Sequence, residues 1–290
     1  MEDHVEKNKV TVLSFGEVLM DCFPDKNVIG GAPFNVAVHL KRLGEEAGII
    51  TKVGKDEVGF QIQKILEHEM LNHQLQIDGD YPTGKVDVTL KNGQPSYHIH
   101  KGCGWEFIGI EEVEDPDYFV FGSLALSFPN NKKTFKFFRD QFSETTFVCD
   151  INLREPFFNY ETIELCLKSA DILKINDEEL EYLAKEFDTN NVISFLKYNF
   201  NIEKVLLTEG AKGATLFWEG KKITCEIKKI ENTVDTVGAG DSFTSMFLYG
   251  IINGSSLSES LRMAADFAGI ICQTDGAVPS DLTLYENFKL

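Results

Sequence analysis

The segment with the clearest chemical potential is VDTVGAGDSFTSMFLYGII, residues 234–252, where a glycine-rich turn runs directly into a helical pattern. The small residues Gly238, Ala239 and Gly240 allow a ligand to approach the backbone closely. The unpaired amides at a helix start favour an anion such as a phosphate group. Because a carboxylate would repel that anion, we interpret Asp241 as a base that accepts the proton of an attacking hydroxyl. The alternative is that Asp241 only caps the helix.

A second segment, IGGAPFNVAVHLKRLG (29–44), places two glycines before a helix that ends at Gly44. The pair Gly30 and Gly31 permits close approach of a ligand, and Asn35 in the first helical turn could hydrogen-bond a polyol. The alternative is that the glycines only shape a turn.

Short apolar runs alternate with amphipathic stretches, which predicts a parallel sheet covered by helices on both faces. The expected strands are 10–15, 47–53, 117–122, 146–151, 171–175 and 203–208, and the expected helices are 33–43, 57–70, 131–142, 160–169, 177–187, 240–253 and 257–273. Residues 85–101 alternate at period two across Asn92-Gly93, which predicts an antiparallel ribbon and a candidate lid. A second hairpin is expected at 214–227, turning at Glu219-Gly220.

Composition limits the possible functions. The 290 residues are 43% hydrophobic and 26% charged, which is ordinary for a globular protein. The net charge of 28 minus 46, or -18, argues against a nonspecific nucleic-acid binder and against attachment to an anionic membrane. Six dispersed cysteines and a charged N-terminus without an apolar run predict a soluble cytoplasmic protein.

Together these segments resemble the ribokinase-like carbohydrate kinases, also called the PfkB family. GGAPFNVAVHLKRLG is similar to the family's first signature, and DTVGAGD has the form of its second, highly specific signature. Three further segments follow in the family's order: KVGKDEVG (52–59), LKINDEELEYL (173–183) and LLTEGAKGATLF (206–217). The resemblance covers nearly the whole chain. It implies a single α/β domain over residues 1–290, a three-layer α/β/α core with a mostly parallel sheet, and a small β lid inserted from about residues 18–32 and 83–106.

The resemblance also implies roles for individual residues. Asp241 would be the catalytic base, and the turn of Gly238, Ala239 and Gly240 would stabilise the charge on the transferring group. Sugar hydroxyls would be held by Asp21, Gly30, Gly31 and Asn35, and nucleotide would be bound by Asn176, Thr208, Gly210 and Gly213 together with Gly238 and Gly240. Arg154, just beyond a strand end, would contact a phosphate or an acceptor hydroxyl, or would form a surface ion pair instead.

The implied cofactor is MgATP. Asn176 and Glu179 match the family's N-x-x-E pattern, through which Glu179 would influence Mg2+ by way of water. Alternatively, the acidic residues 177–179 only complement the helix dipole. The segment GAVPS, ending at Ser280, resembles the one that surrounds a monovalent cation together with Asp235, so activation by K+ is expected; Asp235 could equally just brace the turn.

Several segments are most similar to the fructokinase-like branch: FGEVLMD (15–21), TGKVDVTLKNGQPSYHIH (83–100), FGSLAL (121–126) and DINLREPFF (150–158). Fructose is therefore the first expected substrate, although Gly104, Glu106 and Ser127 depart from that branch's pattern. A kinase for ribose, 2-keto-3-deoxygluconate or a nucleoside is the alternative, and a catalytically silent sugar- or nucleotide-binding regulator is a third reading. The uncovered face of the lid suggests a homodimer.

Overall fold

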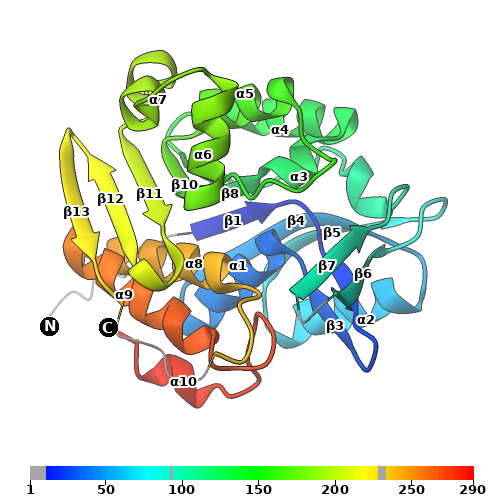
Figure 1. The fold of residues 1–290 in the computed structure, drawn as a ribbon. Helices are drawn as coiled ribbons and strands as arrows, with labels where there is room; N and C mark the ends of the chain where they lie inside the picture. Colours follow the sequence, from blue (N-terminus) through cyan, green and yellow to red (C-terminus); the bar gives the residue numbers. More distant parts are fainter. Residues whose placement is uncertain (1–10, 92–93, 228–232) are drawn as a thin grey trace, which may run out of the picture.

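A computed structural model describes residues 11–91, 94–227 and 233–290 (Figure 1). In this part of the chain a nine-stranded sheet runs through the molecule and a four-stranded sheet lies beside one end of it. The strands of the large sheet, in spatial order, are β13 (Lys221–Cys225), β12 (Ala214–Trp218), β11 (Lys204–Thr208), β10 (Ile172–Asn176), β9 (Thr146–Asp150), β8 (Tyr118–Gly122), β1 (Thr11–Phe15), β4 (Glu46–Gly54) and β5 (Asn72–Asp78).

The large sheet is parallel except at one edge, where β12 pairs antiparallel with both β11 and β13. This confirms the predicted mostly parallel core and the predicted second hairpin. At the hairpin turn, Glu219 and Gly220 both have positive φ angles, 48° and 75°, as a two-residue turn between twisted strands requires. The carboxyl ends of the parallel strands lie at one edge of the sheet, where the segments that follow them meet.

Helices cover both faces of this sheet and form a hydrophobic core on each (Figure 1). One core is completed by α1 (Ala32–Leu43), α2 (Glu57–His68), α8 (Ala239–Ile252), α9 (Leu257–Ile271) and α10 (Thr283–Glu286), and the other by α3 (Ser123–Leu126), α4 (Pro129–Gln141), α5 (Tyr160–Ser169), α6 (Asp177–Glu186) and α7 (Val192–Phe200). Neighbouring residues of one strand divide between them: Val120 joins the first core, whereas Phe119 and Phe121 join the second. The three predicted layers are therefore present.

The small sheet has the order β3 (Asn27–Gly30), β2 (Leu19–Cys22), β6 (Gly84–Lys91) and β7 (Gln94–Ile99). Its central pair, β2 and β6, is parallel and joins two segments distant in sequence. Val86 and Val88 are buried whereas Lys85, Asp87 and Thr89 are exposed, as the period-two pattern predicts. The predicted Asn92-Gly93 turn and the side chain of Leu90 lie outside what the structure describes.

Several elements were not expected from the sequence. They are the edge strand β5, the helix α7, the short helices α3 and α10, and the 3-10 turns Gly104–Phe107 and Gly210–Lys212. The β5 sequence, NHQLQID, is too polar to read as a strand of a buried sheet; it forms at the edge, where it pairs with β4 alone. No helix in the described ranges is long and apolar enough to cross a membrane.

Candidate active site

Asp241 lies in the first turn of α8, three residues after the N-cap residue Gly238. Gly238 has a φ angle of 76°, and a Cβ atom there would lie 2.4 Å from the Cβ of Ala277, so this turn requires glycine on both grounds. The helix start leaves backbone amides without intrahelical acceptors and carries the positive end of the dipole. The structure thus places the carboxylate of Asp241 beside an anion-binding helix start.

The Asp241 side chain is held from the opposite side by α1. Its Oδ2 atom accepts a hydrogen bond of 2.7 Å from Nδ2 of Asn35, and both residues are buried. The α1 helix begins there because Gly31, its N-cap, has a φ angle of 120° and passes so close to Glu17 that a Cβ would lie 2.4 Å from the Glu17 carbonyl oxygen. The two glycine-marked segments of the sequence therefore meet at one carboxylate.

A cleft of about 380 Å3 opens in front of this carboxylate, between the small sheet and the carboxyl edge of the large one. Nine of the residues predicted for the site line it: Asp21, Gly31, Asn35, Arg154, Asn176, Thr208, Gly238, Gly240 and Asp241. The cleft is also lined by Glu17, Leu19, Ala32, Val86, Tyr97, Ile99, Asn152, Lys174, Thr236 and Val237.

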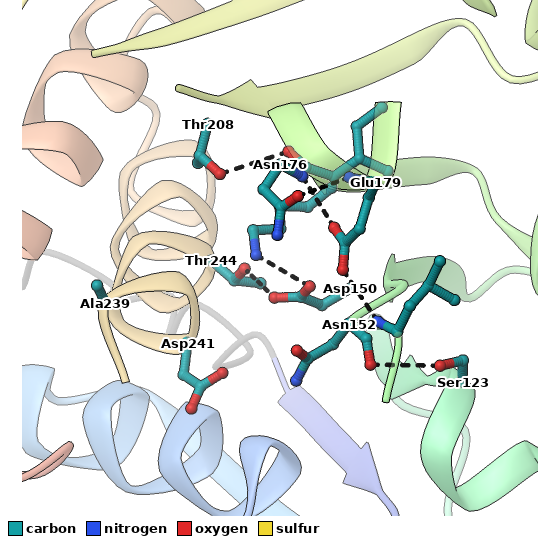
Figure 2. A network of polar contacts seen from close by, with 12 residues as sticks. Ser123, Asp150, Asn152, Asn176, Glu179, Thr208, Ala239, Asp241 and Thr244 are labelled. Atoms are coloured by element: carbon teal, nitrogen blue, oxygen red, sulfur yellow. Dashed lines mark hydrogen bonds and ion pairs between the residues drawn. The ribbon is translucent and has the colours of Figure 1, made fainter. Parts of the chain in front are cut away.

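A buried ion pair supports the floor of the cleft. Lys174 on β10 donates to Oδ1 of Asp150 on β9 at 3.1 Å, and each side chain is only 7% exposed. Oδ2 of the same carboxylate accepts from Thr244 Oγ1 at 3.2 Å, and Figure 2 shows Asp150 and Thr244 together above Asp241. A Cβ atom on Gly240 would lie 2.7 Å from Lys174 Nζ, so the ammonium sits directly against the turn of α8.

The predicted Asn176 and Glu179 form a reciprocal cap at the start of α6 (Figure 2). Asn176 Oδ1 accepts from the Glu179 amide at 2.8 Å, and Glu179 Oε2 accepts from the Asn176 amide at 2.9 Å. Glu179 Oε1 also accepts from the Leu153 amide at 2.9 Å. Glu179 is buried and does not line the cleft, so its contacts toward the cleft run through Asn176 and through the backbone at Leu153.

Burial raises the pKa of Asp241 to about 6, and the neighbouring carboxylate of Asp150 adds to the shift. The hydrogen bond from Asn35 and the charges of Lys174 and Arg154 act in the opposite direction. Asp241 is therefore ionised at neutral pH but sufficiently basic to accept a proton.

Lys174 stays charged despite its burial. Burial alone would lower its pKa, but the carboxylates of Asp150 and Glu179 outweigh that effect and raise the pKa above its usual value. A permanent cation therefore lies beside the helix start.

Seven residues predicted for the site do not line the cleft: Gly30, Glu179, Gly210, Gly213, Asp235, Ala239 and Ser280. Gly30 lies just behind the cleft, because a Cβ atom there would lie 2.7 Å from Asp21 Oδ2. Gly213 has a φ angle of 111° and packs against the Cys225 carbonyl, so the β11–β12 connection needs it for its own geometry. Asp235 accepts a hydrogen bond from the Val237 amide at 3.0 Å, which braces the turn before α8.

The departures from the fructokinase-like pattern are also outside the cleft. Glu106 is buried and its Oε1 accepts from the Cys103 amide at 3.1 Å, while Ser127 Oγ donates to the Ser123 carbonyl at 3.0 Å. Gly104 packs against the backbone of Val53. These residues shape the surroundings of the cleft and contact nothing inside it.

Reasoning from the sequence missed Glu17, Asn152 and Lys174 as cleft residues. A signal for Lys174 was present, since a lone lysine interrupts the apolar run of the strand DILKI and would be buried in a parallel sheet. A buried lysine needs a partner, and Asp150 at the end of the preceding strand offers one. The role of Glu17 depends on how β1 and α1 pack, which no local pattern reveals.

Comparison with known proteins agrees with this geometry. Residues 5–283 match the family described as pfkB family carbohydrate kinase. The chain is 30% identical over 305 residues to the probable fructokinase-6, chloroplastic, of Arabidopsis thaliana, covering 93% of this chain and 79% of that protein. It is 29% identical over 304 residues to fructokinase-2 of Oryza sativa subsp. japonica, covering 93% and 90%.

Solved structures give the same result. The fructokinase from Vibrio cholerae O395 in its fructose, ADP and calcium ion bound form has a TM-score of 0.83 and 25% identity, covering 97% of this chain and 99% of that one. The fructokinase with bound ATP from Xylella fastidiosa has a TM-score of 0.87, and at 20% identity, over 96% and 97% of the two chains, it is similar in fold. The resemblance seen in the sequence is thereby confirmed, and the chain belongs to the pfkB family of carbohydrate kinases.

Proposed function

We propose that the protein is an ATP-dependent fructokinase, in which Asp241 removes the proton of a sugar hydroxyl as the terminal phosphoryl group of ATP is transferred to it. The observation that carries this proposal is the position of Asp241: its carboxylate is buried between Asn35 on one side and the start of α8, with Lys174, on the other. An acceptor hydroxyl and a phosphoryl group can both reach it from the cleft.

Positioning and electrostatics account for the rate in this mechanism, because phosphoryl transfer leaves little covalent work to a protein. The amides at the start of α8 and the ammonium of Lys174, which lies against Gly240, together stabilise the negative charge of the transferring group in this proposal. Asp241, ionised above a pH of about 6, accepts the proton of the attacking hydroxyl. Asn35 holds the carboxylate in place through Nδ2.

The acceptor lies among Asp21, Asn35 and Arg154 in this proposal, with Gly30 and Gly31 shaping the backbone beneath it. Carboxylate and amide groups suit the hydroxyls of a neutral polyol. Fructose is favoured among the polyols because the relatives that match along most of the chain bear the name fructokinase.

The nucleotide occupies the other half of the cleft, near Asn176 and Thr208, where β10 and β11 end. The part that Gly210 and Gly213 take in nucleotide binding stays a prediction. Mg2+ accompanies ATP, and the donor set fits an indirect role for Glu179, since each of its two carboxylate oxygens already accepts a hydrogen bond from a backbone amide. The metal would reduce the repulsion between the phosphates and the acidic cleft.

K+ would be held near Asp235 and the segment 276–280. The Asp235 amide donates to the Cys272 carbonyl at 3.3 Å, which puts the backbone of Asp235 beside the C-cap of α9, four residues before that segment. Ala277 packs against Gly238, so a cation there would steady the turn that opens α8. We expect K+ to raise the catalytic rate, and Na+ or choline chloride at equal ionic strength is the comparison.

We further propose that the small sheet is a lid of one domain spanning residues 1–290, and that its outer face pairs with a second copy. The exposed side chains of Lys85, Asp87 and Thr89 support this, because they form a face that no other described residue covers. Sedimentation velocity tests it: a dimer is expected, and a monomer at micromolar concentration would contradict the proposal.

The six unpaired cysteines suit a reducing compartment, so we place the protein in the cytoplasm.

An acceptor scan tests the proposed function. ADP release would be followed with MgATP and K+ in the presence of fructose, ribose, 2-keto-3-deoxygluconate, glucose and adenosine. The highest kcat/KM is expected for fructose, with slow ADP release when no sugar is present. A higher kcat/KM for another acceptor would retain the kinase and replace the substrate, whereas folded protein without acceptor-dependent turnover would support the silent-regulator reading.

A further inference from the structure

Glu17 is a buried carboxylate that the mechanism above does not use. It follows β1, is 5% exposed, and lines the cleft together with Asp241. The backbone amides of Glu17 itself and of Ala32, the first residue of α1, interact with its carboxylate. In the described part of the chain, no lysine, arginine or histidine forms an ion pair with it within 4.0 Å.

A second, smaller cavity connects the two carboxylates. It has a volume of about 20 Å3, enough for one water molecule, and its lining includes Glu17, Asp150, Asn152 and Asp241. Because Glu17 and Asp241 line both cavities, the charge of Asp241 acts on Glu17 across a short distance.

The two carboxylates are not equivalent. Asp241 has the side-chain donor Asn35 and feels the positive charge of Lys174. Glu17 has backbone amides and the charge of Arg154, which lower its pKa, and the charge of Asp241, which raises it. When the pair shares one proton, that proton therefore belongs on Glu17.

We propose that Glu17 is the proton-holding partner of Asp241: in the working complex it is a neutral carboxylic acid, which leaves the single negative charge of the pair on the base. This inference rests on the proposed role of Asp241. Its consequence is that ionisation of Glu17 adds a second negative charge where the terminal phosphate of ATP must approach, and so slows the reaction at alkaline pH. Glu17 is a positioning residue in this account, because it acts through the charge of the site.

The direction of the titration follows from the surroundings. Burial raises the pKa of Glu17 to about 7, and the charge of Asp241 adds to the shift, against the amides and Arg154. The other charged groups of the site are Asp21 on β2, Asp150 on β9 and Lys174 on β10. Phosphates arriving in the cleft would raise the pKa further, so Glu17 is neutral at pH 7 when ATP is bound.

Thermal unfolding of Glu17→Gln tests the proton independently of activity. The folded protein binds this proton more tightly than the unfolded chain, so ionisation of Glu17 removes stability as the pH rises from about 4.5 through 7. The Tm of the variant relative to the wild type should therefore increase between pH 5 and pH 8.5. Glu17→Met, which also lacks the charge, should show the same trend even if its Tm is lower throughout. A difference in Tm that is constant or falls with pH would overturn the proposal, since Glu17 would then act as an anion at the start of α1.

The kinetic arm compares kcat/KM for the preferred sugar at pH 8.5 and pH 7. The kcat/KM at pH 8.5 divided by that at pH 7 should be about two- to fivefold lower for the wild type than for Glu17→Gln, because the glutamine side chain cannot ionise. Glu106→Gln is the matched control, since Glu106 is equally buried at 5% exposure but does not line the cleft, and its ratio should follow the wild type. Equal ratios for wild type and Glu17→Gln would refute the proposal. If Asp241→Asn retained activity, the assignment of Asp241 as the base would be wrong. The thermal unfolding of Glu17→Gln would still show whether Glu17 holds a proton.

Discussion

Two lysine–aspartate pairs of this protein have the same chemistry and opposite surroundings. Lys174 and Asp150 join neighbouring strands beneath the α8 turn, and both side chains are 7% exposed. Lys26 and Asp275 join the turn between β2 and β3 to the loop after α9, and their side chains are 37% and 71% exposed. The buried pair is shielded from solvent and salt, whereas water and ions weaken the exposed one. The buried pair therefore holds the charge of Lys174 in a fixed place at the floor of the cleft, whereas the exposed pair contributes little to the position of the small sheet.

The largest effect is expected from Lys174→Met. Loss of the ammonium removes a donor to the transferring phosphoryl group and should reduce kcat by about 10²–10³-fold. It also leaves Asp150 buried without its ion-pair partner, which should lower the free energy of unfolding by about 3–5 kcal/mol.

The double variant Lys174→Met/Asp150→Asn separates these two effects. It contains no unpaired buried charge, so it should recover most of the stability in urea denaturation while kcat stays low. Recovery of activity along with stability would show that Lys174 acts only as a structural partner of Asp150.

Asn35→Ala should have the next largest effect, which is a shift in the pH dependence of kcat. The hydrogen bond from Asn35 lowers the pKa of Asp241, so its loss raises that pKa, and the base becomes protonated at a higher pH. The wild-type acid limb should lie near pH 6, and the variant's should lie about one unit higher. Measurement of kcat from pH 5 to 8 would show this, and an unshifted acid limb would mean that Asn35 does not act on the base.

Side chains of the small sheet should contribute less to activity than those at the floor of the cleft. Tyr97 on β7 lines the cleft and is 45% exposed, so Tyr97→Ala should raise the KM for the sugar roughly fivefold and change kcat little, an effect of about 1 kcal/mol. The matched control is Tyr198→Ala on α7, where the side chain is 83% exposed and outside the cleft. A change in kcat without a change in KM would place Tyr97 in the chemical step instead.

The smallest effect is expected from the exposed pair. Lys26→Ala should change the KM for the sugar by less than about twofold, and the difference from the wild type should disappear in high salt. Titration of fructose at low and high NaCl concentration measures it. A large change in KM that persists in high salt would mean that the Lys26–Asp275 ion pair holds the small sheet in place.

The sequence predicted the architecture well where one residue type decides the local geometry. Gly31, Gly44 and Gly238 adopt positive φ angles at the helix ends where the pattern placed them, and the apolar runs became the inner strands of the sheet. β5 was missed because an edge strand needs no apolar run. α7 was missed because most of its nine residues, VISFLKYNF, are β-branched or aromatic, and such residues have low helix propensity.

The site was predictable only in part, for a different reason. Asp241 and Asn35 stand beside glycine turns that mark them locally, whereas Lys174, Asp150 and Glu17 meet through strand register and helix packing. The lone lysine in DILKI indicates a buried partner, but sequence spacing alone does not give the register that brings Lys174 and Asp150 together. The same limit applies to Asp235 and Ser280, whose proposed cation site depends on how two distant segments approach each other.

The most direct test of the account is the turnover of Asp241→Asn, which keeps the shape and the contact with Asn35 but removes the base. We predict that kcat for fructose falls by about 10³-fold at pH 7.5, while the KM for the sugar changes only a few fold and the Tm does not decrease. A folded variant with kcat within tenfold of the wild type would contradict the assignment of Asp241 as the base.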